Sequence, residues 1–170
     1  MTTIVDYLEK HRQDFPEKVF VQIDSQKWTF ENIYNKVNKI NLILNQFPTN
    51  SVISIMFDNS IEFIISYLGI IKAGKIVHII SPSISKKNFL EQIKSCNPKI
   101  ILTLKKFIGE FETIQNKIKL VDFYEFESEN ISKKKSEISD ISSLIYTSGT
   151  TSSPKGVPIK HENTIFTTKN

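Results

Sequence analysis

This chain of 170 residues is almost without cysteine and alanine, and it has no long apolar run. Cys96 is the only cysteine, so neither a disulfide framework nor a cysteine-based metal site can form within the chain. Ala73 is the only alanine, and we attribute this scarcity, together with the heavy use of Ile, Lys and Asn, to coding bias. Nothing in the cysteine content argues for an oxidising compartment.

The N-terminus lacks a targeting signal. Met1 to Glu9 carries acidic residues where a signal peptide would carry basic residues followed by an apolar core. The richest apolar stretch, residues 61–71, contains Glu62 and Ser66 and is too short to span a bilayer. We therefore expect a soluble, cytoplasmic protein with no membrane span.

The composition is that of one ordinary globular domain. Hydrophobic residues make up 39% and charged residues 24% of a chain that is long enough to bury a core. The formal net charge of +4 and the pI near 9.0 raise the question of nucleic-acid binding. However, the lysines are scattered, and the only tight run, Lys133–Lys135, is flanked by acidic residues as in a solvated loop. We therefore do not expect a nucleic-acid partner.

Strand-like and helix-like apolar patterns alternate along most of the chain. Helices are expected at 4–11, 30–47, 61–72, 85–95 and 107–116, and strands at 18–24, 51–57, 75–80, 99–104, 117–123, 141–146 and 155–159. Repeated strand–helix–strand units of this length imply parallel strands joined by right-handed crossovers. The sequence thus predicts an α/β fold, with a parallel-rich sheet and flanking helices, and a polar surface loop at 124–139.

Two local patterns define the helices further. Thr29 stands at the N-cap position of the second helix, and Asn32 occupies the place of the Glu or Gln of a capping box. In the fourth helix, the 3–4 spacing predicts that Phe89, Leu90 and Ile93 face the core.

The most informative stretch runs from Tyr146 to Val157 and reads Tyr-Thr-Ser-Gly-Thr-Thr-Ser-Ser-Pro-Lys-Gly-Val. A glycine lets the backbone approach an anion closely, and successive amides in a turn form an anion-binding nest. The hydroxyl side chains donate hydrogen bonds, and Lys155 adds a positive charge that suits phosphate. These residue types in this order are suited to holding a polyphosphate.

Two alternatives bear on this loop. It is not a Walker A loop, because Pro154 precedes Lys155 and Gly156 follows it, where that motif has Gly-Lys-Ser/Thr. Since no helix can begin properly behind Lys155, the helix dipole that assists a P-loop is missing as well. On composition alone, a flexible Ser/Thr-rich connection between two strands is the more frequent outcome. The order of the residues argues against that second alternative.

That order resembles the phosphate-binding loop of the acyl-adenylate-forming superfamily, the AMP-binding synthetases and ligases. The family pattern is approximately Tyr-Thr-Ser-Gly-Thr-Thr-Gly-x-Pro-Lys-Gly-Val, and this chain departs from it at Ser152, where the family also accepts serine. The match continues to Asn163, because His161-Glu162-Asn163 is similar to the family's His-x-Asn.

The rest of the chain agrees with this resemblance. Segments 27–30, 56–63 and 67–74 resemble the family's Trp-Thr-Tyr, Pro-Asn-Ser-x-Glu-Phe and Leu-Gly-x-x-Lys-Ala-Gly patterns, in that order. Asp140 stands where an acidic residue commonly precedes the loop. The resemblance covers essentially the whole chain and implies the N-terminal portion of an acyl-CoA synthetase-like AMP-binding domain.

The resemblance implies ATP-dependent activation of a carboxylic acid. The carboxylate attacks the α-phosphorus of ATP, pyrophosphate leaves, and the acyl-adenylate passes its acyl group to a thiol, with coenzyme A as the expected acceptor. Such a reaction needs positioning and electrostatic support of the leaving pyrophosphate. The complete enzyme, an AMP-forming acid–thiol ligase, would use ATP with Mg²⁺ and a small carboxylic acid. By carry-over from the motif, the residues expected to contact the ATP phosphates are Thr147, Ser148, Gly149, Thr150, Thr151, Ser152 and Lys155.

Several parts of the family's reaction centre have no counterpart in residues 1–170. These are the adenine-binding segment, the Thr-Glu magnesium site, the ribose-binding Asp, and the C-terminal lid domain with its catalytic Lys. We therefore expect a partial adenylation domain with no catalytic residue or metal ligand of its own, whose partner is the downstream part of the same domain. His11, His78 and His161 are expected to be structural. Whether the chain alone is an enzyme stays open, and the alternative is a non-catalytic α/β module that binds phosphate or a protein partner.

Overall fold

The computed structural model describes residues 2–109, 111, 119–127, 137–147 and 154–169. At its centre is a six-stranded sheet with the strand order β6-β5-β3-β4-β7-β8. The strands are β3 Val52–Met56, β4 Ile76–Ile79, β5 Ile101–Thr103, β6 Leu120–Asp122, β7 Ile141–Thr147 and β8 Lys155–Lys160. The first five strands in this order pair in parallel, and β8 pairs antiparallel with β7. The predicted α/β fold with a parallel-rich sheet is confirmed.

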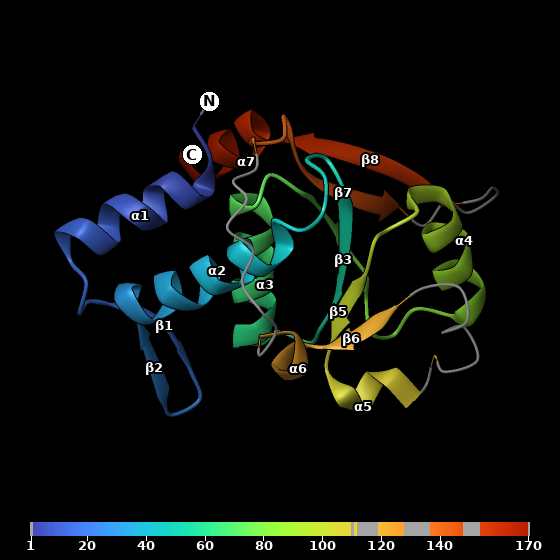
Figure 1. The fold of residues 1–170 in the computed structure, drawn as a ribbon, viewed down its shortest axis with the longest axis horizontal. Coiled ribbons are helices and arrows are strands. Elements are labelled where there is room, and N and C mark those ends of the chain that lie inside the picture. The colour runs from blue at the N-terminus through green and yellow to red at the C-terminus, as the bar shows by residue number, and fades with distance from the viewer. Residues whose placement is uncertain (1, 110, 112–118, 128–136, 148–153, 170) are drawn as a thin grey trace.

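Helices cover both faces of the sheet (Figure 1). On one side lie α1 Ile4–Asp14, α2 Phe30–Leu44, α3 Ile61–Lys72 and α7 His161–Lys169, and on the other lies α4 Lys86–Cys96. A separate two-stranded hairpin, β1 Val19–Ile23 and β2 Gln26–Thr29, precedes α2. The apolar core divides accordingly, with a larger cluster under α1, α2 and α3 and a smaller one under α4.

The start of α2 follows the predicted capping box. The Asn32 amide donates to the Thr29 hydroxyl at 3.2 Å, and the Thr29 amide donates to the Asn32 side-chain oxygen at 3.2 Å. The shorter carboxamide of asparagine thus serves in place of Glu or Gln. One side of this helix faces the core, with Ile33, Val37, Ile40 and Leu44 buried.

The connection between α3 and β4 depends on Gly74. This residue has φ +68°, in the left-handed region that glycine adopts at helix ends. A Cβ atom at position 74 would lie 1.8 Å from the carbonyl oxygen of Glu137, so the chain that returns toward β7 packs directly on the glycine. The predicted end of helix α3 at residue 72 is confirmed.

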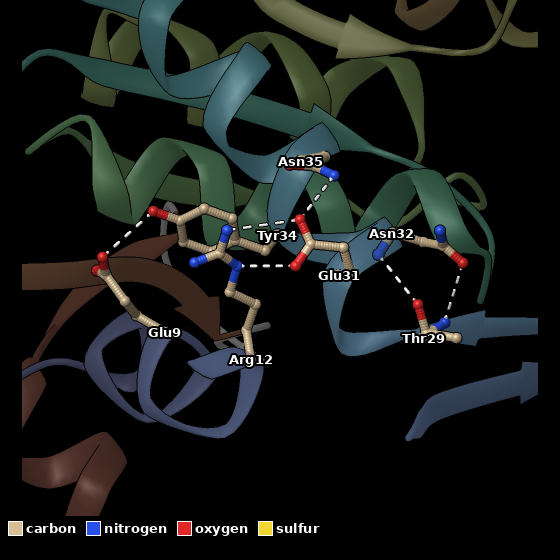
Figure 2. Close-up of polar contacts among 7 residues, drawn as sticks. All are labelled: Glu9, Arg12, Thr29, Glu31, Asn32, Tyr34 and Asn35. Atoms are coloured by element: carbon tan, nitrogen blue, oxygen red, sulfur yellow. Dashed lines mark hydrogen bonds and ion pairs between the residues drawn. The ribbon is translucent and has the colours of Figure 1, made fainter. Parts of the chain in front are cut away.

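A polar network binds α1 to α2 (Figure 2). Arg12 Nε lies 2.9 Å from the Glu31 carboxylate, and the guanidinium stacks over the Tyr34 ring at 4.7 Å. The Tyr34 hydroxyl donates to Glu9 at 3.2 Å, and Lys72 of α3 pairs with the same carboxylate at 3.5 Å. These contacts hold the first helix on the outer side of the helical layer.

The structure differs from the sequence predictions between residues 105 and 139. Helix α5, Lys105–Ile108, begins two residues before the helix expected at 107–116, of which 110 and 112–116 lie outside the described residues. Where a surface loop was expected at 124–139, the chain first forms α6 Phe123–Glu127, and residues 128–136 of that loop lie outside the described residues. Asp122 causes the helix, because its Oδ1 accepts the amides of Tyr124 and Glu125 at 3.0 and 3.3 Å.

Two expectations of burial were wrong. Leu90 does not face the core but is 44% exposed, because Phe89 and Ile93 already occupy the inward side of α4. The strand expected to be buried at 141–146 is buried at Ser142 and Ser143 but 43% exposed at Ile145. That position pairs with Val157 of the edge strand β8, which is equally exposed.

Candidate phosphate-binding site

The predicted phosphate-binding stretch forms the β7–β8 hairpin. Thr147 ends β7, Lys155 begins β8, and the two residues lie opposite each other in the strand register. Both side chains are exposed. The other predicted contacts, Ser148, Gly149, Thr150, Thr151 and Ser152, lie outside the described residues and remain predictions. The structure therefore brings together the two ends of the loop, one hydroxyl and one ammonium group.

The hairpin emerges at the carboxyl edge of the parallel sheet. Because β4 and β7 are parallel neighbours, Ile79 and Thr147 end their strands at the same edge. Ligands of open α/β sheets bind outside the carboxyl ends of the strands. A hollow of about 530 Å³ lies here, between the end of β7, the segment after β4, and α4. The position of the predicted loop thus agrees with the general rule for this architecture.

The hollow is largely apolar, carries several hydrogen-bonding groups, and has no charged side chain among its described lining residues. Its hydrogen-bonding groups come from Ser81, Ser83, Asn88, Gln92, Tyr146 and Thr147, and isoleucines with Pro154 supply the apolar wall. No acidic or basic side chain is among the described residues that line it. Positive charge at this edge comes from Lys155, whose strand starts directly after Pro154. An anion would therefore be held at the rim, with neutral donors and acceptors behind it.

A buried polar cluster lies beneath the hollow, centred on His78 of β4. The imidazole is fully buried, with Nδ1 2.8 Å from the Ser54 hydroxyl of β3 and Nε2 3.3 Å from Gln92 Oε1 of α4. A carboxamide oxygen only accepts, so Nε2 carries the proton and Nδ1 accepts from Ser54. Burial lowers the pKa of His78 to about 4, which agrees with a neutral ring.

Cys96, the only cysteine, belongs to the same cluster. Its sulfur lies 3.3 Å from His78 Nδ1. Burial raises the pKa of the thiol to about 11, so it stays protonated at neutral pH and is a poor nucleophile.

Tyr146 connects this cluster to the hairpin. Its ring meets the His78 ring edge-on at a centroid distance of 5.1 Å, and its hydroxyl faces Ser95 and Cys96 at the end of α4. On the other side the ring covers Gly156, its register partner on β8. A Cβ atom at position 156 would lie only 3.0 Å from Tyr146 Cζ. The glycine after Lys155 therefore has a steric role, since it leaves room for the tyrosine ring.

The other two histidines are not among the described residues that line the hollow. His11 is exposed, bonds its own helix through the Tyr7 carbonyl at 2.8 Å, and stacks on Phe30 at 5.4 Å. His161, at the start of α7, is 1% exposed, and burial lowers its pKa while the carboxylates of Asp6 and Asp140 oppose this shift. Across the part of the chain that the structure describes, no cluster of three or more His, Cys, Asp or Glu side chains could hold a metal ion.

The residues that sequence reasoning missed are Gln92 and the polar groups after β4. The sequence shows Gln92 only as one polar position on an amphipathic helix, and no local pattern pairs it with His78. A histidine in the middle of the apolar run 75–80 was the one available signal, because such a residue needs buried hydrogen-bond partners.

Comparison with known proteins decides the family. A family model described as AMP-binding enzyme matches residues 8–170. The chain belongs to the AMP-binding enzyme family. It is 30% identical over 166 residues to bacitracin synthase 2 of Bacillus licheniformis, which covers 94% of this chain and 6% of that protein. It is also 30% identical over 165 residues to zwittermicin A synthase ZmaJ of Bacillus cereus, covering 94% of this chain and 31% of that protein.

Solved structures share the fold of this AMP-binding chain. The o-succinylbenzoate CoA synthetase of Bacillus subtilis, in complex with its acyl-adenylate intermediate, matches 95% of this chain with a TM-score of 0.83 and 22% identity. The anthranilate CoA ligase AuaEII, in complex with anthranoyl-AMP, matches 99% with a TM-score of 0.88 and 22% identity. The chain spans 44% and 36% of those two proteins, respectively. None of the helices in the described residues is long and apolar enough to cross a membrane.

Proposed function

We propose that this chain supplies the pyrophosphate side of an ATP-dependent carboxylate-activating site. The observation that carries the proposal is the placement of Thr147 and Lys155 as register partners at the carboxyl edge of the sheet. The loop they bracket has the family's order of glycine, serine and threonine residues. Thr147, Lys155 and the predicted contacts Ser148, Gly149, Thr150, Thr151 and Ser152 would together hold the β- and γ-phosphates.

The reaction requires stabilisation of the negative charge on the leaving pyrophosphate, and no covalent bond between the protein and the substrate. A carboxylate oxygen bonds to the α-phosphorus of ATP, the bond between this phosphorus and the bridging oxygen breaks, and pyrophosphate leaves with the electron pair. Lys155 and the loop donors would stabilise the negative charge that develops on that leaving group. Mg²⁺ would arrive with the ATP phosphates. In one solved structure the o-succinylbenzoate CoA synthetase is itself in complex with ATP and a magnesium ion.

The acyl acceptor is proposed to be a thiol, with coenzyme A as the first candidate. Support comes from the solved structures of similar fold, since the o-succinylbenzoate synthetase is also bound with a product analogue named OSB-NCoA. The curated relatives include a nonribosomal peptide synthetase of Cochliobolus heterostrophus, 28% identical over 182 residues. A thiol on a carrier protein is therefore the second candidate. Residues 1–170 are proposed to form the N-terminal part of the adenylation domain and to act together with its remaining parts.

Competition between nucleotides tests the proposal on the chain itself. Calorimetric titration should show that ATP–Mg²⁺ and pyrophosphate bind and displace each other, because both use the phosphate groups. AMP should compete far more weakly, since it lacks the β- and γ-phosphates. If the folded chain binds neither ATP–Mg²⁺ nor pyrophosphate, the proposal is contradicted. The remaining alternative is then a non-catalytic module that binds a protein partner. If AMP competes as well as pyrophosphate does, the nucleotide does not bind through its β- and γ-phosphates, and this hairpin is not its binding site.

A further inference from the structure

A continuous line of contacts leads from α4 to the hairpin. Gln92 Oε1 accepts from His78 Nε2 at 3.3 Å, and the His78 ring meets the Tyr146 ring at 5.1 Å. Tyr146 immediately precedes Thr147, and it lies opposite Gly156, which immediately follows Lys155. Gln92 thus reaches the base of the hairpin through two rings.

Each member of this line is held in place from a second side. Ser54 on β3 fixes the other nitrogen of His78 at 2.8 Å. Gly156 presents no side chain, so the Tyr146 ring lies between β8 and the imidazole. The edge contact between the buried His78 ring and the half-buried Tyr146 ring has a preferred orientation, and so does a neutral imidazole hydrogen-bonded at both nitrogens. A change at Gln92 should therefore be transmitted to the hairpin.

We propose that Gln92 and His78 are positioning residues. Through the ring of Tyr146 they would fix where Thr147 and Lys155 lie at the base of the hairpin. The inference rests on the proposed function, because a positioned pair matters only if the hairpin binds phosphate. It goes beyond that function in assigning a role to α4, a helix that contributes no residue to the phosphate-binding motif. Neither residue needs to touch the nucleotide.

The first test uses NMR to detect a change in the backbone around the hairpin of the unliganded chain. The sequence contains five glycines, so a ¹⁵N-glycine label gives a simple amide spectrum. Gln92→Leu should shift the amide resonance of Gly156 while the resonance of Gly109, the C-cap residue of α5, stays in place. The matched control is Gln22→Leu, since Gln22 is exposed on β1 and bonds only within its own turn, to the Asp24 carbonyl at 3.0 Å. It should leave Gly156 unchanged.

The second test measures the affinity for ATP–Mg²⁺ at a temperature at which every variant is folded. Gln92→Leu should weaken ATP–Mg²⁺ binding about threefold to tenfold, the effect of one lost hydrogen bond in a positioned network. A purely structural role would lower the unfolding temperature and leave the affinity of the folded chain unchanged. Tyr146→Leu should weaken binding at least as much. In the Tyr146→Leu background, Gln92→Leu should then have no further effect, because the connection is already broken.

The outcomes separate the two proposals. If Gly156 does not respond to Gln92→Leu, the positioning inference is overturned, whatever the chain binds. If Gly156 responds but Gln92→Leu and Tyr146→Leu weaken binding additively, Gln92 does not act through Tyr146, and the inference fails in that form. If Lys155→Ala leaves ATP–Mg²⁺ affinity unchanged, the proposed function fails instead, and with it the purpose of the positioning.

Discussion

Thr147 and Lys155 lie directly opposite each other across the β7–β8 hairpin, at the carboxyl edge of a parallel sheet. Residues that oppose each other in an antiparallel pair project their side chains to the same face. A hydroxyl and an ammonium group are therefore presented together at the base of the loop. Tyr146 and Gly156, one position further along, project to the other face and join the hairpin to α4. One face of the hairpin thus presents the groups proposed to bind the anion, and the other face packs against the rest of the domain.

The packing of Tyr146 on Gly156 predicts that Gly156→Ala is destabilising. The new methyl group would lie 3.0 Å from Tyr146 Cζ and 3.1 Å from Leu144 Cδ1, so the ring must move. We expect a loss of about 1–2 kcal/mol in the free energy of unfolding, as for other overpacked sites. Gly109→Ala is the control, because none of the described residues has an atom within 4 Å of the added methyl group. Urea unfolding should show that variant to be as stable as the unchanged chain or slightly more stable.

The burial of His78 predicts a loss of stability in mild acid. Its pKa is about 4 in the folded chain and 6.5 in the unfolded chain, so between these values the unfolded chain binds more protons. The stabilisation is complete above pH 6.5 and is lost as the pH falls toward 4, with a slope of at most about 1.4 kcal/mol per pH unit. His161, whose pKa is also lowered by burial, contributes with the same sign.

Urea unfolding as a function of pH tests this dependence. The slope between pH 6.5 and 5 should be smaller in His78→Gln than in the unchanged chain. Equal slopes in the unchanged chain and in His78→Gln would show that the imidazole does not lose its proton on folding.

Asp122 is predicted to be the most important single carboxylate for the region around β6. It is buried and accepts three backbone amides, those of Lys105, Tyr124 and Glu125, at 2.7, 3.0 and 3.3 Å. Asp122→Ala leaves these donors unpaired and should cost about 1–3 kcal/mol of unfolding free energy. Glu125→Ala, an exposed acid on the same helix, should cost much less. Similar losses in both variants, measured by urea unfolding, would contradict the capping role of Asp122.

The fold could be predicted from the sequence where a single pattern determined it. Helix α3 was placed at its observed bounds, and the start of α2 was placed correctly by its capping residues, although α2 ends at Leu44 and not at residue 47 as expected. The prediction of a loop at 124–139 failed at its start because a local cap was overlooked and because the burial of two phenylalanines depends on packing against distant residues. Helix α6 depends on Asp122 as its cap and on the burial of Phe123 and Phe126, which a polar composition after residue 124 concealed.

The candidate site could likewise be predicted only where a local motif determines it. The motif predicted Thr147 and Lys155 as its ends, and the register confirms that the two are neighbours. The contribution of Gln92 could not be predicted, because it depends on a hydrogen bond to His78, a residue on a strand and 14 positions earlier in the chain. The steric reason for Gly156 likewise appears only when β8 is paired with β7.

Calorimetric titration of the chain with ATP–Mg²⁺, comparing Lys155→Ala with Lys160→Ala, tests the central claim most directly. Both lysines are exposed on β8, at opposite ends of the strand, so the two variants remove the same charge at different places. We predict that Lys155→Ala weakens binding about tenfold or more, since it removes a charged hydrogen-bond donor to phosphate, with little change in the unfolding temperature. Lys160→Ala should bind like the unchanged chain. Equal affinity in the two variants would contradict the assignment of this hairpin as the phosphate-binding site.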